Sequence, residues 1–278
     1  MPRWHEVPRA VAGRLTRRLA ARLPLAVAHR LYRGVAPLAR VPSGVRAVGH
    51  DGLHLEGAAL RRWQQRAWWG SALSRTVKDR LARGDDRGVA GAVLPIDWAP
   101  LDHALARGRG AVVVGAHVGP GGVVPWALAQ RYADLLCLIG TGDDPPPPHL
   151  AVHDVLAPAS RATALAAARL TLRRGGVVYL PADGTPGTAY DERRLAGRRI
   201  RIGAGAPTLA RLCQAPAVPA CALWEGRRIR LDLAPAILPQ ATDAAAWKDE
   251  WLAAYCAWLG THLRGDGENL QLDAADWS

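Results

Sequence analysis

Three apolar segments constrain the fold of this chain more than any other feature of the sequence. They read AVVVGAH at 111–117, DLLCLIG at 134–140 and VVYLPAD at 177–183. Continuous apolar runs of this length are typical of strands that are buried on both faces of a parallel sheet. Helical patterns separate the three runs, one that begins past Pro125 and continues to about 133 and one at 160–176. This alternation predicts an α/β fold with a central, mostly parallel sheet flanked by helices.

Further helices and strands are expected on both sides of this alternation. A helix rich in tryptophan is predicted over 60–83, and a C-terminal helix around 244–263. The segments AVPACALWE and RIRLDLAPAI indicate two antiparallel strands that are joined by a turn at 225–227. The polar, glycine-rich segment 184–205 is predicted as a connection that leads into another helix. A chain of this length can bury one sizeable core, so a single domain over 1–278 is expected.

A basic amphipathic helical segment is predicted in the N-terminal part of the chain, at about 9–42. Its apolar residues recur four apart, and arginines fill other positions of the pattern. Pro24 lies inside the segment and is expected to kink the helix. Such a helix is suited to attach to an anionic membrane surface, or to pack on the domain with a solvated basic edge. The apolar positions are Val11, Leu15, Leu19, Leu23, Val27 and Leu31.

The chain is strongly basic, with 36 Lys plus Arg against 24 Asp plus Glu and a net charge of +12. An acidic carrier protein, an anionic membrane surface and nucleic acid all suit such a charge. No nucleic-acid-binding motif accompanies it, so nucleic acid is not the expected partner. No apolar run approaches the roughly 18 residues that a spanning helix needs, and no signal peptide is recognised. We therefore expect a cytoplasmic protein, with peripheral contact to the inner face of the cell membrane as an option for its N-terminal helix.

The cysteines are not expected to carry chemistry. All four lie in apolar surroundings and none has CxxC spacing, which is typical of reduced core residues. Neither a metal site nor a bound cofactor is therefore predicted. The four residues are Cys137, Cys213, Cys221 and Cys256.

Two chemically useful side chains come at the ends of predicted strands. His117 ends the first apolar run and Asp183 ends the third. The carboxyl ends of parallel strands meet at one edge of a sheet, where ligands of α/β proteins bind, so we expect both residues at that edge. A glycine-rich turn with Gly119, Gly121 and Gly122 follows the histidine. Its N–H groups could hold an oxyanion or a phosphate at a helix start, or the glycines could serve only to make a tight turn.

Three blocks of the sequence occur in an order that matches a known enzyme family. They read HALARGRGAVVVGAHVG, RRGGVVYLPADGTPG and LAGRRIRIGAGAPTLARLCQAPAVPAC. These blocks resemble those of the bacterial lipid A biosynthesis acyltransferases, the late lauroyl and myristoyl transferases, from about Asp97 to Ile237. The resemblance implies a glycerol-3-phosphate/lysophospholipid acyltransferase-like fold and acyl transfer from an acyl-carrier-protein or coenzyme A thioester to a hydroxyl or amine. The phosphopantetheine thioester is then a co-substrate, and no other cofactor is implied.

The resemblance also implies a role for His117. In that family a histidine at a strand end is followed five residues later by an acid, in the pattern H-x4-D/E. The histidine takes the proton of the acceptor, and the carboxylate orients the imidazole. Here Gly122 stands in the position of the acid, and Asp183 is the best candidate to replace it, unless Asp183 is only a turn or cap residue. The weaker candidates are Asp191, Glu192 and Glu225.

A literal match to the same pattern occurs elsewhere, from His149 to Asp154. With nine histidines and 24 acidic residues in the chain, about one such match is expected by chance. The match also follows a proline tract and not a strand, so His149 is predicted to be a surface residue.

A substrate cleft is implied as well. Arg198, Arg199 and Arg201 lie in the third block, where they would contact a phosphopantetheine or lipid phosphate, or form a solvated charge run. Trp126 is a candidate substrate-binding residue, because a narrow tunnel with apolar and tryptophan side chains would suit an acyl chain.

The sequence therefore predicts an acyltransferase of lipid or specialised-metabolite biosynthesis. The alternative is a catalytically silent homologue that binds an acyl chain, a carrier protein or a biosynthetic partner, because the motif acid is missing. Lipid A itself is a less suitable acceptor, since the usual N-terminal membrane anchor and the acid are both missing.

Overall fold

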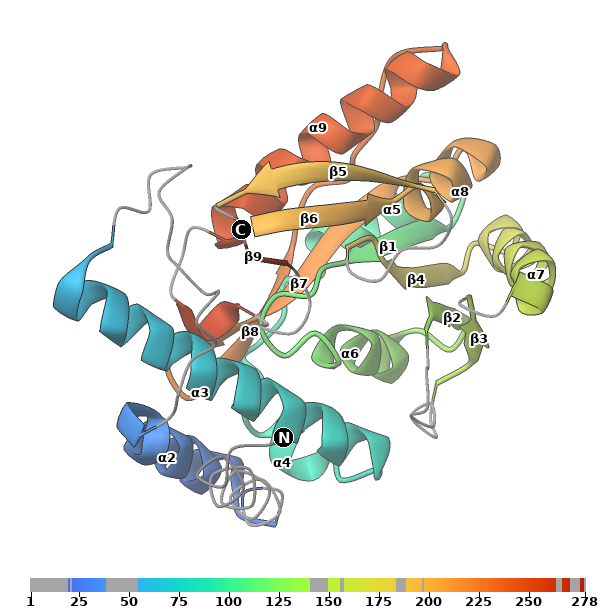
Figure 1. The fold of residues 1–278 in the computed structure, drawn as a ribbon. Helices are drawn as coiled ribbons and strands as arrows, with labels where there is room; N and C mark the ends of the chain where they lie inside the picture. The colour runs from blue at the N-terminus through green and yellow to red at the C-terminus, as the bar shows by residue number, and fades with distance from the viewer. Residues whose placement is uncertain are drawn as a thin grey trace.

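A six-stranded sheet forms the centre of the structure, and helices pack on both of its faces (Figure 1). The strand order is β3-β2-β4-β1-β7-β8, in which five strands are parallel and β8 is antiparallel to β7. The predicted α/β fold with a mostly parallel sheet is confirmed. The computed structural model describes residues 20, 22–38, 55–140, 150–155, 158–183, 189–196, 198–263, 267–270 and 276–277.

The strands of the central sheet are short except for β7. A second, smaller sheet has the order β5-β6-β9 and is antiparallel throughout. The central strands are β1 Ala111–Gly115, β2 Leu135–Ile139, β3 Val152–Asp154, β4 Val177–Pro181, β7 Ala217–Glu225 and β8 Arg228–Leu233. The strands of the smaller sheet are β5 Tyr190–Leu195, β6 Arg198–Gly203 and β9 Asp276–Trp277.

The helices of the described residues vary from a single turn to 26 residues in α3. They are α2 Leu25–Val35, α3 Gly57–Ala82, α4 Arg87–Ala90, α5 Ala99–Leu105, α6 Val123–Arg131, α7 Arg161–Arg173, α8 Gly205–Cys213 and α9 Ala244–Leu263. Short 3-10 helices are η1 Ala36–Leu38, η2 Pro158–Ser160 and η3 Gly267–Asn269.

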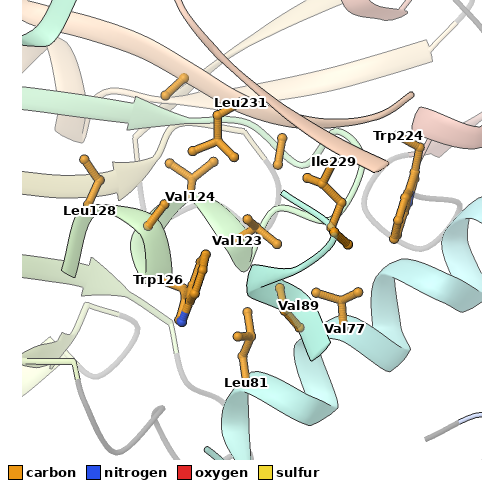
Figure 2. Close-up of a cluster of buried hydrophobic side chains, with 14 of the residues drawn as sticks. Val77, Leu81, Val89, Val123, Val124, Trp126, Leu128, Trp224, Ile229 and Leu231 are labelled. Carbon is orange, nitrogen blue, oxygen red and sulfur yellow. The ribbon is translucent and has the colours of Figure 1, made fainter. Parts of the chain in front are cut away.

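Strand β1 explains why the sheet has two hydrophobic layers. Successive side chains of a strand point to opposite faces, and every residue of β1 is buried. Val113 packs in a cluster with α2, α3 and α6, whereas Val112 and Val114 pack in a second cluster with α7, α8 and α9. Figure 2 shows part of the first cluster, in which Leu81 of α3 and Trp126 of α6 lie among other apolar side chains. Coverage of both faces is the reason that the run at β1 is continuously apolar.

Most of the predicted elements are present where the sequence places them. The helices expected over 60–83 and 244–263 are confirmed as α3 and α9, and β7 and β8 are antiparallel as predicted. Helix α6 begins at Val123 and not after Pro125. Proline is tolerated there because the N–H groups of a first helical turn have no intrahelical acceptor.

The prediction that segment 184–205 is only a connection was wrong. Its described part contains the antiparallel pair of β5 and β6, which begins at the pairing of Leu195 with Arg198. Ile200 and Ile202 of β6 are buried, and the arginines between and beside them hide this alternation in the sequence. A period of two residues is the signal of a half-buried strand, and it was present here.

Helix α2 packs on α3 with a face that differs from the predicted one. It begins directly after Pro24, so this proline precedes a new helix and does not kink a longer one. Its buried residues include Leu25, Ala28 and Tyr32, whereas Val27 is 42% exposed. The Tyr32 hydroxyl lies 2.9 Å from the Thr76 hydroxyl of α3. The prediction that Val27 faces inward was wrong, because the break at Pro24 starts a new helical register. Residues 9–19, 21 and 39–42 of the predicted helical segment lie outside the described residues.

Within the part of the chain that the structure describes, no helix has the length and apolar character needed to cross a membrane. All four cysteines are free thiols. Cys137 and Cys221 are buried and Cys213 and Cys256 are partly buried, and burial raises the pKa of all four thiols. At neutral pH these thiols are therefore protonated, as core cysteines are.

Helix α8 offers a matched test of the described packing. Leu209 is buried against the sheet, whereas Leu212, one turn further, is 55% exposed. Leu209→Ala should lower the free energy of unfolding by roughly 2–4 kcal/mol, because it leaves a cavity in the core. Leu212→Ala should change it by less than about 0.5 kcal/mol. Urea denaturation of both variants measures the difference, and equal losses would contradict the described orientation of α8.

Candidate functional site

His117 and Asp183 meet because their strands are parallel and in register. Strands β1 and β4 pair so that Gly115 lies opposite Pro181. His117 lies two positions after Gly115, and Asp183 lies two positions after Pro181. Both segments therefore leave the sheet at the same edge. The sequence analysis predicted this juxtaposition, and the structure brings the two side chains into contact.

The contact between the two residues is both a backbone and a side-chain interaction. The backbone N–H of His117 donates to the Asp183 carboxylate, with both oxygens 2.9 Å from the nitrogen. Nδ1 of the imidazole lies 3.1 Å from Oδ1 of the same carboxylate. In the tautomer that carries its proton on Nδ1, the ring donates to Asp183 and keeps Nε2 as its basic nitrogen. The Asp183 side chain is only 9% exposed, while that of His117 is 38% exposed.

Two buried tyrosines support the strand end beneath this pair. The Tyr255 hydroxyl of α9 donates to the Gly115 carbonyl at 2.9 Å. Tyr179 of β4 lies so close to Gly115 that a Cβ there would be 2.3 Å from its hydroxyl oxygen. Burial, with the nearby Asp183 charge adding to it, raises the pKa of both phenols. Both phenols are therefore neutral at physiological pH. Because of the close approach of Tyr179, glycine is the residue that fits at position 115.

None of the other carboxylates considered from the sequence is paired with His117. Asp191, Glu192 and Glu225 instead form ion pairs with Lys or Arg side chains. Asp183 is therefore the carboxylate that the fold places beside His117. Asp154 lies on edge strand β3, which β2 and β4 separate from β1, and His149 lies outside the described residues. The ion pairs of the others are Asp191 with Lys248 at 2.8 Å, Glu192 with Arg201 at 3.6 Å and Glu225 with Arg230 at 4.0 Å.

The glycine-rich turn has fewer available N–H groups than its sequence suggests. The Gly119 N–H donates to the Asn269 carbonyl at 2.6 Å, and the Gly121 N–H donates to the Gly119 carbonyl at 3.0 Å. Gly122 is the N-cap residue of α6, and its N–H has no acceptor among the described residues. Of the three glycines, Gly122 is thus the one whose N–H lies at a helix start without an acceptor among the described residues.

Asn269 is a residue that the sequence analysis missed. Its backbone carbonyl accepts from Gly119, and its side-chain Oδ1 accepts from the backbone N–H of Trp224 at 2.6 Å. Its Nδ2 donates to the Trp224 carbonyl at 3.3 Å. Asn269 therefore fixes the turn after His117 to the extended end of β7. No periodic pattern marks η3 in the sequence, and the contacts join positions far apart in the chain, so no sequence signal identified it.

The described contacts of Trp126, Arg199 and Arg201 are with residues other than His117. Trp126 is buried in the core cluster of Figure 2, so apolar packing accounts for its position. Arg199 and Arg201 flank Glu192, at 4.0 and 3.6 Å, on the face of β6 opposite its buried isoleucines. Arg198 begins β6. The role of these residues in substrate binding stays a prediction.

One group of possible metal ligands is present in the described part of the chain. Single ligand atoms of Cys221, Asp232 and His262 lie within 4.8 Å of one another. Asp232 already accepts from Trp258 Nε1 at 3.2 Å and from Arg230 at 2.8 Å. His262, with these two donors, holds the pKa of Asp232 well below its usual range. The protein donors Trp258, Arg230 and His262 already hold the Asp232 carboxylate, and these contacts account for its position without a cation.

The turn after His117 gives a second matched test. Gly119 has a φ of +55°, and a Cβ there would be 2.1 Å from the Ala222 carbonyl oxygen. Gly119→Ala should therefore lower the free energy of unfolding by roughly 2–4 kcal/mol. Gly122 has a φ of −63° and its Cβ would be 3.8 Å from Leu81, so Gly122→Ala should change stability by less than about 1 kcal/mol. Thermal or urea unfolding distinguishes the two, and a tolerated Gly119→Ala would contradict this packing of the turn.

Comparison with known proteins adds no assignment to this geometry. No family model matches the chain, and no curated protein matches it.

Proposed function

We propose that this protein is an acyltransferase that moves an acyl group from a carrier-protein or coenzyme A thioester to a hydroxyl or amine. The contact between His117 Nδ1 and the buried Asp183 carboxylate, at the carboxyl edge of a parallel sheet, is the observation that carries the proposal. A partly exposed imidazole with a buried anionic partner is the arrangement that general-base catalysis requires.

His117 acts as the base through Nε2. This nitrogen takes the proton of the acceptor as the acceptor oxygen or nitrogen attacks the thioester carbonyl. Asp183 stabilises the imidazolium that forms. When the tetrahedral intermediate collapses, the carbon–sulfur bond breaks and the imidazolium gives its proton to the leaving thiolate. The imidazole is then neutral again, and the products are the acylated acceptor and the free thiol.

Gly122 contributes a backbone group to the same reaction. Its N–H lies at the start of the nine-residue helix α6, where the helix dipole favours negative charge. It is the donor that we assign to the oxyanion of the tetrahedral intermediate. Glycine at this position is then compatible with activity, because Asp183 supplies from β4 the carboxylate that the H-x4-D/E pattern has in the turn.

The other predicted binding features belong to this proposal. An acidic acyl carrier protein fits the net charge of +12, and acyl-CoA offers the same thioester and phosphate chemistry. Arg198, Arg199 and Arg201 are the proposed contacts to a donor phosphate, and Trp126 the proposed contact to the acyl chain. Peripheral membrane contact would bring the protein to a lipid acceptor, while a specialised-metabolite acceptor needs no such contact.

Thioester transfer with a panel of acyl-CoA and acyl-carrier-protein donors, and hydroxyl and amine acceptors, tests the mechanism. His117→Ala should reduce the rate about 10²–10⁴-fold, because the base is lost. Asp183→Asn keeps the shape of the side chain but removes its charge, and it should also reduce the rate by at least about 10²-fold. Asp191→Asn is the control, since Asp191 is paired with Lys248, and its rate should stay within about twofold of wild type.

Unchanged transfer by His117→Ala would refute the mechanism. The alternative function, a catalytically silent homologue, is favoured by Gly122 in the place of the motif acid. It would be supported if the wild-type protein cleaved no thioester of the panel but bound an acyl carrier protein tightly.

A further inference from the structure

A cavity of about 450 Å³ lies between α2 and the turn that joins β7 to β8. It is lined by His29, Arg30, Arg33 and Arg227. The first three residues come from one helix, and Arg227 is about 200 positions later in the chain. All four lining side chains are basic types, and this cavity has no part in the proposed catalytic site.

No described carboxylate neutralises the three arginines of this cavity. Arg131, Arg201 and Arg230 are each paired with a carboxylate within 4 Å. In contrast, none of the three cavity arginines has an ion pair with any residue that the structure describes. Guanidinium groups that are close together repel one another, and an anion between them would offset that repulsion. Their charge is therefore available to a ligand.

His29 gives a second, independent indication of a ligand. It is only 2% exposed, and its ring packs edge-on against Trp69 with 4.9 Å between ring centroids. Neither ring nitrogen has a hydrogen bond of good geometry to a described residue, and the Gly226 backbone makes only a weaker polar contact with the ring. Burial, together with the charge of Arg33, lowers the pKa of His29, so the ring is neutral at neutral pH. A buried ring N–H without an acceptor is costly, and a ligand oxygen in the cavity would satisfy it.

The cavity also lies at the edge of the sheet where ligands bind. Strand β7 runs parallel to β1, with Ala220 opposite Gly115, and it continues to Glu225. Arg227 follows in the next turn, on the same side of the sheet as His117 but further out. Arg227 and His117 therefore both follow the carboxyl ends of parallel strands of one sheet.

From these observations we infer that the cavity binds the phosphate group of an anionic ligand. Arginine forks match phosphate oxygens in pairs of parallel hydrogen bonds, and the His29 N–H adds a neutral donor from the cavity wall. A phospholipid headgroup and a soluble phosphate ester share this chemistry. The inference stands apart from acyl transfer, because it requires neither His117 nor Asp183.

Calorimetric titration with pyrophosphate at low ionic strength is the direct test. The wild-type protein should bind pyrophosphate, and Arg33→Gln and Arg227→Gln should each bind it about fivefold more weakly. Arg62→Gln is the matched control, because Arg62 is an exposed arginine of α3 without an ion pair to a described residue. The control should bind as the wild type does. Thermal unfolding checks that the exposed substitutions leave the fold intact.

Co-sedimentation with phosphatidylcholine vesicles, with and without phosphatidic acid, then identifies the source of the phosphate. If Arg33→Gln and Arg227→Gln weaken both pyrophosphate binding and binding to the acidic vesicles, the cavity takes a lipid phosphate. If they weaken pyrophosphate binding alone, the ligand is a soluble phosphate ester. Both outcomes support the site.

Three results would overturn the inference. They are no binding of pyrophosphate by the wild type, equal binding by the wild type and the two cavity variants, and an equal loss in Arg62→Gln. The third result would mean that overall charge and not this cavity holds the anion. His117→Ala should bind pyrophosphate normally, so failure of the catalytic proposal and failure of this inference can be told apart.

Discussion

The Asp183 carboxylate ties together the ends of two neighbouring strands. It accepts the backbone N–H of His117 and also contacts the imidazole of the same residue. The buried carboxylate thus accepts the backbone N–H just beyond the end of β1 and also orients the imidazole of His117. A hydrogen bond from a backbone N–H to a charged acceptor is stronger than one between neutral groups. The position of His117 therefore depends on a residue that is 66 positions away in the chain.

Close backbone approaches hold the surroundings of this pair in place. The glycine at position 115 leaves room for the Tyr179 hydroxyl, and the glycine at 119 leaves room for the Ala222 carbonyl. Gly70 of α3 has the same function for η3, because a Cβ there would be 2.0 Å from the Glu268 carbonyl oxygen. Through these contacts the C-terminal residues 267–270 join α3, β7 and the turn after His117. The site is therefore built from three distant parts of the chain around glycines.

The sequence predicts the centre of this arrangement well, for physical reasons. Strands covered on both faces must be continuously apolar, and parallel strands end at one edge, so the neighbourhood of His117 and Asp183 follows from three short runs. The pair of β5 and β6 was missed because arginines on its outer face obscure Ile200 and Ile202. Asn269 could not be found, since hydrogen bonds to a distant backbone leave no periodic trace. In α2 the predicted face failed because a proline at the helix start changes which residues turn inward.

The basic cavity and the His117 pair lie at one edge of the sheet, and the turn after His117 connects them. Gly119 of this turn approaches the Ala222 carbonyl, and Asn269 links the same turn to Trp224 near the end of β7. Arg227 follows in the turn after β7. The Asp183 carboxylate has its own local partners, which are the backbone N–H and the imidazole of His117. A ligand held by its phosphate in the cavity would be positioned by that end alone, and the chemistry at His117 would depend on the length and shape of the rest of the ligand.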